Sequence, residues 1–127
     1  MSTIDVLIIV DTGHALASGN LGVFTLMVDD TNAEALHASN ELVTPCRSGQ
    51  NIEWRAVSID DGQQLDIVSF QGQAVGSVIV PKPVEIGNQT YWASEVQSRT
   101  SGQFQYTCTL NIEGKNMTFD PFLLVSA

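Results

Sequence analysis

The chain has few positive charges. Five Lys and Arg residues stand against fourteen Asp and Glu residues, which gives a net charge of −9 over 127 residues. The cations are never adjacent; they are Arg47, Arg55, Lys82, Arg99 and Lys115. Binding nucleic acid requires clustered cations that neutralise phosphates and release counterions. The sequence therefore predicts no nucleic-acid partner and no anionic membrane surface, and it leaves cations, neutral sugars and other proteins as partners.

Cysteine and long apolar runs are also scarce. Cys46 and Cys108 are too few for a disulfide framework, so the sequence favours two reduced thiols and leaves a single bridge open. No apolar run approaches the ~20 residues of a membrane-spanning helix. The run 4–10 contains Asp5 and lacks a basic start, unlike a signal peptide. We expect a cytoplasmic protein, with export without a cleaved signal left open.

Motifs for catalysis and for transition metals are missing. His14 and His37 stand alone, with no HxxxH or CxxC spacing around them. No GxSxG nucleophile elbow is present. Cys108 alternates with apolar residues and is expected to be buried, whereas Cys46 is expected in a loop that would lower its thiol pKa and leave a redox role open. The sequence therefore predicts a protein that is not an enzyme.

Short apolar or alternating runs, broken by Gly, Asn, Asp and Pro, fill the chain and predict strands. In the clearest, 104–112, every second residue is apolar; a turn over 113–116 and a return strand through Met117 and Phe119 complete a hairpin. Trp54 is expected to point inward. Other strands are predicted over 4–10, 23–29, 52–59, 65–70, 75–80, 91–96 and 122–125, the first and last of these apolar on both faces.

Helical periodicity is weak, because its only stretch, 32–40, is too short to be convincing. Loops are expected over 12–22 and 81–83. Without crossover helices, a parallel sheet is not expected. We therefore predict one all-β domain over 1–127, an antiparallel two-sheet β-sandwich, with a jelly roll as one version of it.

Two acidic loops are candidates for a cation site. Asp29 and Asp30 leave one predicted strand, and Asp60 and Asp61 leave another. Calcium prefers six to eight oxygen ligands, often supplied by such loops. Neither loop has EF-hand spacing, and Asp is common in turns for conformational reasons. Calcium as a cofactor and an ordinary turn both stay open at each loop.

An aromatic pair is the candidate for a ligand site. Tyr91 and Trp92 lie close to Asn88 in sequence. A sugar site combines an aromatic ring against the sugar face with carboxylate or amide hydrogen-bonding groups, so these residues are candidates for binding carbohydrate. The alternative is that one or both rings fill the core.

Several segments, in the same order along the chain, resemble a known family. They are IDVLIIVDT at 4–12, GQNIEW at 49–54 followed by Asp60, FQG at 70–72, GQFQY at 102–106 and MTFDPF at 117–122. Together they resemble the AidA/PixA family of bacterial inclusion-body proteins. The ending MTFDPF is the most specific of these segments.

The resemblance implies a small non-enzymatic bacterial protein. Members of the family are expected to be under quorum-sensing control, linked to host association, or stored in intracellular inclusions. It implies no catalytic residues and favours a homo-oligomer. This chain departs from methionine-rich relatives, because it contains three methionines. The hypothesis is an accessory protein that acts by self-association or binding; the alternative is a calcium-assisted carbohydrate-binding module.

Overall fold

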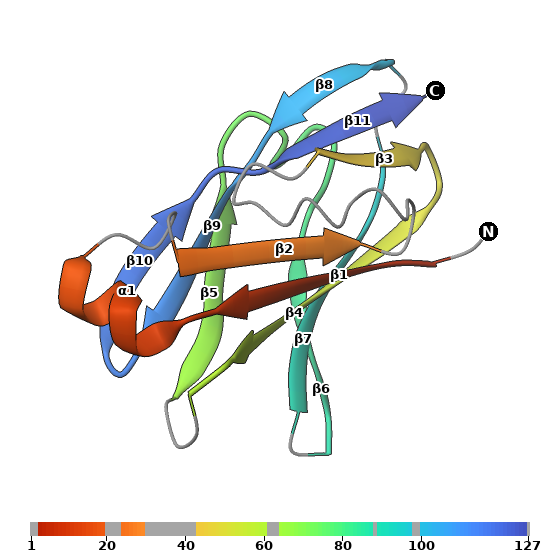
Figure 1. The fold of residues 1–127 in the computed structure, drawn as a ribbon. Helices are drawn as coiled ribbons and strands as arrows, with labels where there is room; N and C mark the ends of the chain where they lie inside the picture. The colour runs from red at the N-terminus through yellow and green to blue at the C-terminus, as the bar shows by residue number, and fades with distance from the viewer. Residues whose placement is uncertain are drawn as a thin grey trace.

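The computed structural model describes residues 3–19, 24–29, 43–60, 64–87, 89–97 and 100–126. Within these ranges the chain forms strands and one short helix, which confirms the all-β class (Figure 1). The elements are β1 (Thr3–Val10), α1 (Thr12–Ser18), β2 (Thr25–Asp29), β3 (Val43–Arg47), β4 (Asn51–Ser58), β5 (Leu65–Gln71), β6 (Lys82–Ile86), β7 (Gln89–Glu95), β8 (Gly102–Gln105), β9 (Thr107–Ile112), β10 (Lys115–Phe119) and β11 (Phe122–Ser126). No helix in these ranges has the length and hydropathy of a membrane span.

The largest sheet has five strands in the order β2-β1-β4-β7-β6. β1 pairs with β2 in antiparallel register and with β4 in parallel register. Side chains alternate between the faces of a strand. Accordingly the inner face of β1 carries four buried residues, Ile4, Val6, Ile8 and Val10, and each lies beside an inward-facing residue of β4.

A long hairpin near the C-terminus is divided at its middle. β9 and β10 pair in one three-stranded sheet, β10-β9-β5, whereas β8 and β11 pair in another, β3-β11-β8. The break lies at Tyr106 and Pro121, where the Tyr106 N–H donates to the Pro121 carbonyl over 3.0 Å. The Asp120-Pro121 pair ends β10 because proline has no N–H for the ladder. The predicted strand 104–112 is therefore two strands, and the predicted hairpin over β9 and β10 is confirmed.

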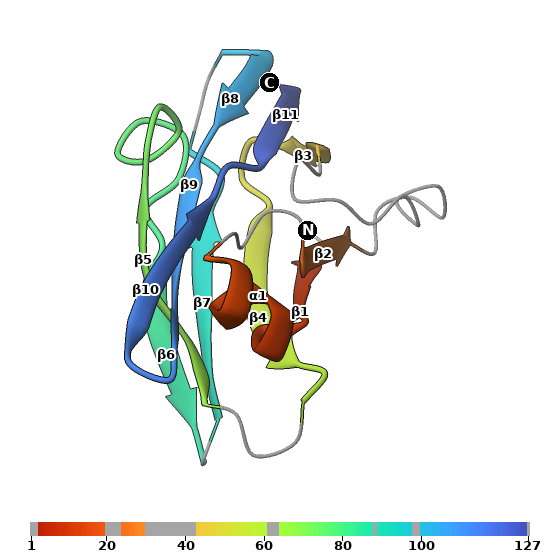
Figure 2. The same ribbon diagram turned by 60° about the vertical axis from the view of Figure 1, so that its left-hand side comes forward.

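The core lies between the five-stranded sheet and the strands β5, β9 and β10, which face it (Figure 2). Trp54 of β4 is fully buried, as expected, and its ring centroid lies 4.9 Å from that of Phe70 and 6.0 Å from that of Tyr106. The Trp54 indole N–H donates to the Tyr106 hydroxyl over 3.1 Å. This pair satisfies two polar groups that burial would otherwise leave without a partner.

Two predicted segments are corrected by the structure. The segment 75–80 is not a strand; the chain turns back on itself, and the Val78 and Ile79 amides both donate to the Ala74 carbonyl. Gly72 and Gly76 have φ of +100° and +99°, which permits this turn. Val78 and Ile79 are apolar because their side chains are buried in the core, so hydrophobicity alone misled the strand prediction.

Two predicted loops contain regular structure. α1 begins after Asp11, whose side chain accepts from the His14 amide, and ends at Gly19 with φ of +72°. These are the N-cap and C-cap signals of a helix, here too short for periodicity to reveal. The predicted loop 81–83 enters β6, an edge strand that tolerates Pro83.

The predicted sheet arrangement is also corrected. β1 and β4 are parallel, as are β3 and β11, so the pairing is mixed rather than antiparallel throughout. The chain from β1 to β4 passes through α1, β2 and β3, so the intervening strands make the crossover that a helix was expected to make. Within the described ranges the strands pair into three sheets, so the two-sheet form of the sandwich is not confirmed. The jelly-roll arrangement stays a prediction, and the weak helical stretch 32–40 lies outside the described residues.

Candidate functional site

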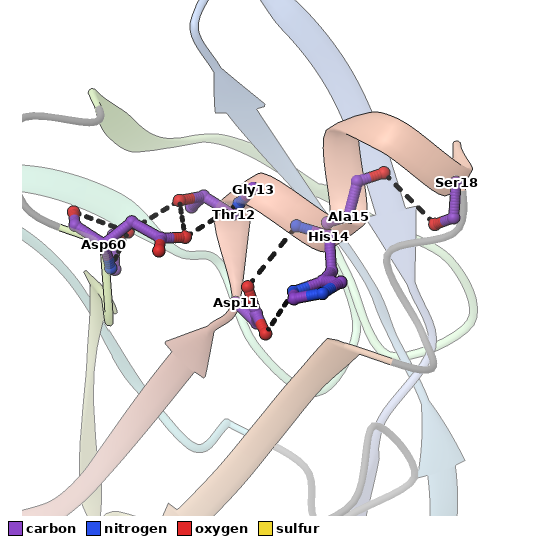
Figure 3. A network of polar contacts seen from close by, with 8 residues as sticks. Asp11, Thr12, Gly13, His14, Ala15, Ser18 and Asp60 are labelled. Atoms are coloured by element: carbon purple, nitrogen blue, oxygen red, sulfur yellow. Dashed lines mark hydrogen bonds and ion pairs between the residues drawn. The ribbon is translucent and has the colours of Figure 1, made fainter.

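A polar network joins α1 to the end of β4, and Asp60 is at its centre (Figure 3). One Asp60 carboxylate oxygen accepts from the Gly13 amide over 2.8 Å and from the Thr12 hydroxyl over 3.0 Å. The Thr12 and Ser58 hydroxyl oxygens lie 2.8 Å apart. The Gly13 amide, followed by the Thr12 hydroxyl, lowers the pKa of Asp60 below its ordinary value. The network therefore holds Asp60 ionised and fixes the start of α1 against β4.

Asp11 and His14 extend this network on the solvent side of α1. The Asp11 carboxylate caps the helix and lies 2.8 Å from Nδ1 of His14. The His14 ring stacks on Phe24 with centroids 5.5 Å apart, and its side chain is 72% exposed. His14 is thus a surface histidine with a carboxylate partner three residues before it. Its function in this geometry is to support the turn into the helix.

The acidic loops do not converge in the described part of the chain. Asp29 lies at the end of β2 opposite Val6, and its carboxylate accepts from the Thr44 hydroxyl over 2.9 Å. Asp60 lies beyond the end of β4, whose Ser58 is opposite Val10. Four residues of strand separate the two positions, roughly 13 Å. Asp30 and Asp61 lie outside the described residues.

Among the side chains that the structure describes, no three His, Cys, Asp or Glu residues form a group that could hold a metal ion. The Asp29 and Asp60 carboxylates instead accept protein hydrogen bonds. Both carboxylates thus join segments that are distant in sequence, and calcium binding at these loops stays a prediction.

The predicted sugar-binding pair is divided between two faces of β7. Trp92 points inward, since it pairs with Trp54, and its indole N–H donates to the Ile67 carbonyl over 3.1 Å. Tyr91 points outward and lies under Arg55, whose guanidinium carbon is 4.9 Å from the ring centroid. Asn88 lies outside the described residues. Tyr91 and Trp92 therefore cannot contact the same ligand from a regular strand.

A small recess lies beside Trp92, between the five-stranded sheet and β5. Its volume is about 210 Å³, below the ~300 Å³ of the smallest common ligand sites. Four of its lining residues are apolar and two are polar. The lining residues are Ala56, Leu65, Asp66, Ile67, Thr90 and Trp92. The sequence pointed to Trp92, and Thr90 lies two residues before it on β7, whereas Asp66 comes to the recess only because β5 packs beside this sheet.

Sequence reasoning missed the outer face of the five-stranded sheet. Two rows of apolar side chains cross it, defined by the strand register: Leu26, Ile9 and Val57 in one, Val28 and Leu7 in the other. We call these five residues the apolar rows. The run 4–10 was expected to be a strand apolar on both faces; its inner residues are buried, whereas Leu7 and Ile9 keep part of their surface exposed.

Both cysteines are free and buried. Cys46 lies in β3, not in the loop that was expected to lower its pKa; burial instead raises the pKa of its thiol to about 11. Burial also raises the pKa of Cys108. The expected low-pKa setting for Cys46 is therefore wrong, because the thiolate would be desolvated.

Comparisons with known proteins identify a family and a fold. Residues 2–118 match the family described as Domain of unknown function (DUF8788). The sequences of curated proteins give no match. The structure resembles the crystal structure of an inclusion body protein (PixA) from Burkholderia cenocepacia J2315, with a TM-score of 0.65 and 13% identity, over 99% of this chain and 94% of that one. The AidA/PixA resemblance is therefore confirmed at the level of the fold.

Proposed function

Because the chain belongs to the DUF8788 family, whose description names no activity, we propose a function from its structure: it is a non-enzymatic accessory protein that acts by self-association. The observation that carries this proposal is the exposed part of the apolar rows. Leu26 and Val57 are 46% and 44% exposed, and both lie in the row through Ile9. Contiguous apolar surface of this kind marks interaction sites in soluble proteins.

The fold similarity supports the same proposal. The Burkholderia cenocepacia relative is an inclusion body protein, and dense storage of a protein requires contacts between its copies. Cytoplasmic inclusions, quorum-sensing control and host association, which the sequence resemblance implies, belong to this proposal.

Light scattering coupled to size exclusion tests self-association directly. We expect a mass above that of one 13.7 kDa chain, rising with protein concentration. Higher salt should strengthen association, because it screens repulsion between chains of net charge −9. A strict monomer at every concentration and salt would contradict the proposal.

Carbohydrate binding is the second candidate, and the recess beside Trp92 favours it. Trp92 gives the recess an aromatic wall, and Thr90 is a polar residue beside it on β7, so the recess combines an aromatic ring with a polar residue, as sites for small sugars do. A glycan array, run with calcium and then with a chelator, tests carbohydrate binding and the role of calcium separately. Binding that is equal in the wild type and in the Thr90→Val variant would exclude this recess as the site.

A further inference from the structure

The outer face of the five-stranded sheet combines apolar and charged rows in a fixed order. Next to the apolar rows, Arg55 reaches both Asp5 and Glu53, with 3.5 Å between guanidinium nitrogen and carboxylate oxygen in each pair. In the register, Asp5 lies opposite Glu53 and Leu7 opposite Arg55. One edge of the apolar surface is therefore bordered by charges of both signs.

The outer face of the sheet β10-β9-β5 has a different composition. Asn111 and Asn116 are hydrogen-bonded side chain to side chain over 2.8 Å, and Thr109 lies opposite Thr118. Such a polar face is typical of antiparallel sheets whose outer surface is in water. The outer face of the five-stranded sheet carries apolar side chains along its apolar rows in place of such polar ones. This face is therefore suited to contact with protein.

Charge favours a second copy of this chain as the occupant of that face. By strand alternation the face carries two cations, Arg55 and Lys82, against three acids, Asp5, Glu53 and Glu95. That leaves an excess of one negative charge, whereas the whole chain has −9. Two copies that meet through this face bring surfaces of low net charge together, and Arg55 of one copy can approach the carboxylates of the other.

The area of the face reaches the threshold for a specific interface. In the order β2-β1-β4-β7-β6 the strands have 5, 8, 8, 7 and 5 residues, and at ~3.3 Å per residue and ~4.8 Å between strands they cover roughly 520 Å². About 1,000 Å² in total for two copies lies at the lower limit of specific protein interfaces. A contact of this size is reversible and depends on protein concentration.

We infer that two copies of the chain associate face to face through the outer surface of the five-stranded sheet, with the apolar rows of β2, β1 and β4 in contact and Asp5, Glu53 and Arg55 beside them. This inference rests on the proposed self-association and adds the surface that performs it. Because the same patch serves both copies, the expected product is a closed two-fold dimer.

A matched pair of double variants tests the surface. The face variant is Leu26→Lys with Val57→Lys, at residues that are 46% and 44% exposed. The control variant is Leu124→Lys with Val68→Lys, at residues that are 44% and 42% exposed on β11 and β5. The two variants match in residue types, exposure and added charge. Circular dichroism and thermal melting first establish that each is folded.

Analytical ultracentrifugation of the wild type and both variants over a wide concentration range gives the dimer dissociation constant. We expect the face variant to raise it roughly a hundredfold or more, because four lysines would be buried in each dimer, and the control variant to change it little. If the wild type associates and the face variant associates equally well, or if both variants lose association equally, this surface is excluded and the proposed function survives. A wild-type protein that stays monomeric would contradict both the face-to-face dimer and the proposed self-association.

Discussion

On the inner face of β1, Ile8 is fully buried against β4 and the opposing strands, whereas one residue later Ile9 lies on the outer face between Leu26 and Val57 and stays partly exposed. The two faces of the five-stranded sheet thus differ little in composition along these strands. They differ in their surroundings. The inner face is buried in the core, whereas Leu26 and Val57 on the outer face are partly exposed to solvent.

That difference separates two effects of hydrophobic residues. On the inner face they stabilise the monomer, because folding removes their surface from water. On the outer face part of their surface stays in water after folding. Burying that surface against another protein would stabilise the complex. The alternation of a strand assigns each residue to one of these effects, and a shift of register by one residue would exchange them.

The largest expected effect is on the inner face. Ile8→Ala should lower the free energy of unfolding by about 2–5 kcal/mol, because it leaves a cavity in a packed core. Ile9→Ala, the same change one residue along the strand, should cost less than half as much in dilute solution. Urea denaturation at low protein concentration measures both, and equal losses would show that both faces are covered in the monomer.

A smaller effect is expected from the buried hydrogen bond on the inner side. Tyr106→Phe removes the hydroxyl that accepts from the Trp54 indole, leaving that N–H without its partner. The expected loss of unfolding free energy is about 1–3 kcal/mol. Tyr91→Phe, on the outer face, is the control and should stay within about 0.5 kcal/mol of wild type. Losses of the same size in the two variants would mean that the buried bond adds nothing.

The network where β1 and β4 end should give a pH dependence. The pKa of Asp60 lies below its ordinary value of 3.8, so the ionised carboxylate stabilises the folded state above that pH. This stabilisation is lost as the pH falls through the lowered pKa. The difference in melting temperature between wild type and Asp60→Asn should therefore be present at pH 6 and close well below pH 3.8. A difference that is unchanged across this range would contradict the assigned hydrogen bonds.

Local patterns in the sequence were sufficient for much of the fold. The alternation through β9 and β10 is a property of neighbouring residues, so the hairpin was predicted correctly. α1 was missed because seven residues give too little periodicity, although Asp11 and Gly19 carried its cap signals. The segment 75–80 was mispredicted because the apolar side chains of Val78 and Ile79 serve the core from a turn.

The candidate sites depended on contacts that sequence spacing does not contain. Asp60 was singled out as a metal ligand, yet its observed partners, Thr12 and Gly13, lie 48 and 47 residues earlier. Asp66 comes to the recess beside Trp92 only because β5 packs beside β7. The apolar rows could not be identified because a doubly apolar strand looks the same whether its second face is covered by its own chain or by another copy.

The smallest expected effect concerns the reactivity of cysteine thiols. This reactivity distinguishes buried positions from exposed ones without a large change in stability. In the native protein at pH 8, Cys46 and Cys108 should resist iodoacetamide, because both are buried and a pKa of about 11 leaves about 0.1% of Cys46 as thiolate. The cysteine introduced by Val57→Cys should react readily in dilute solution, and mass spectrometry distinguishes the three sites.

If the outer face joins two copies, the reaction at position 57 should slow as protein concentration rises, whereas a cysteine introduced by Val68→Cys should keep its rate. Native modification of Cys46 as fast as position 57 would contradict the burial of β3, and equal rates at position 57 at all concentrations would contradict the face-to-face dimer.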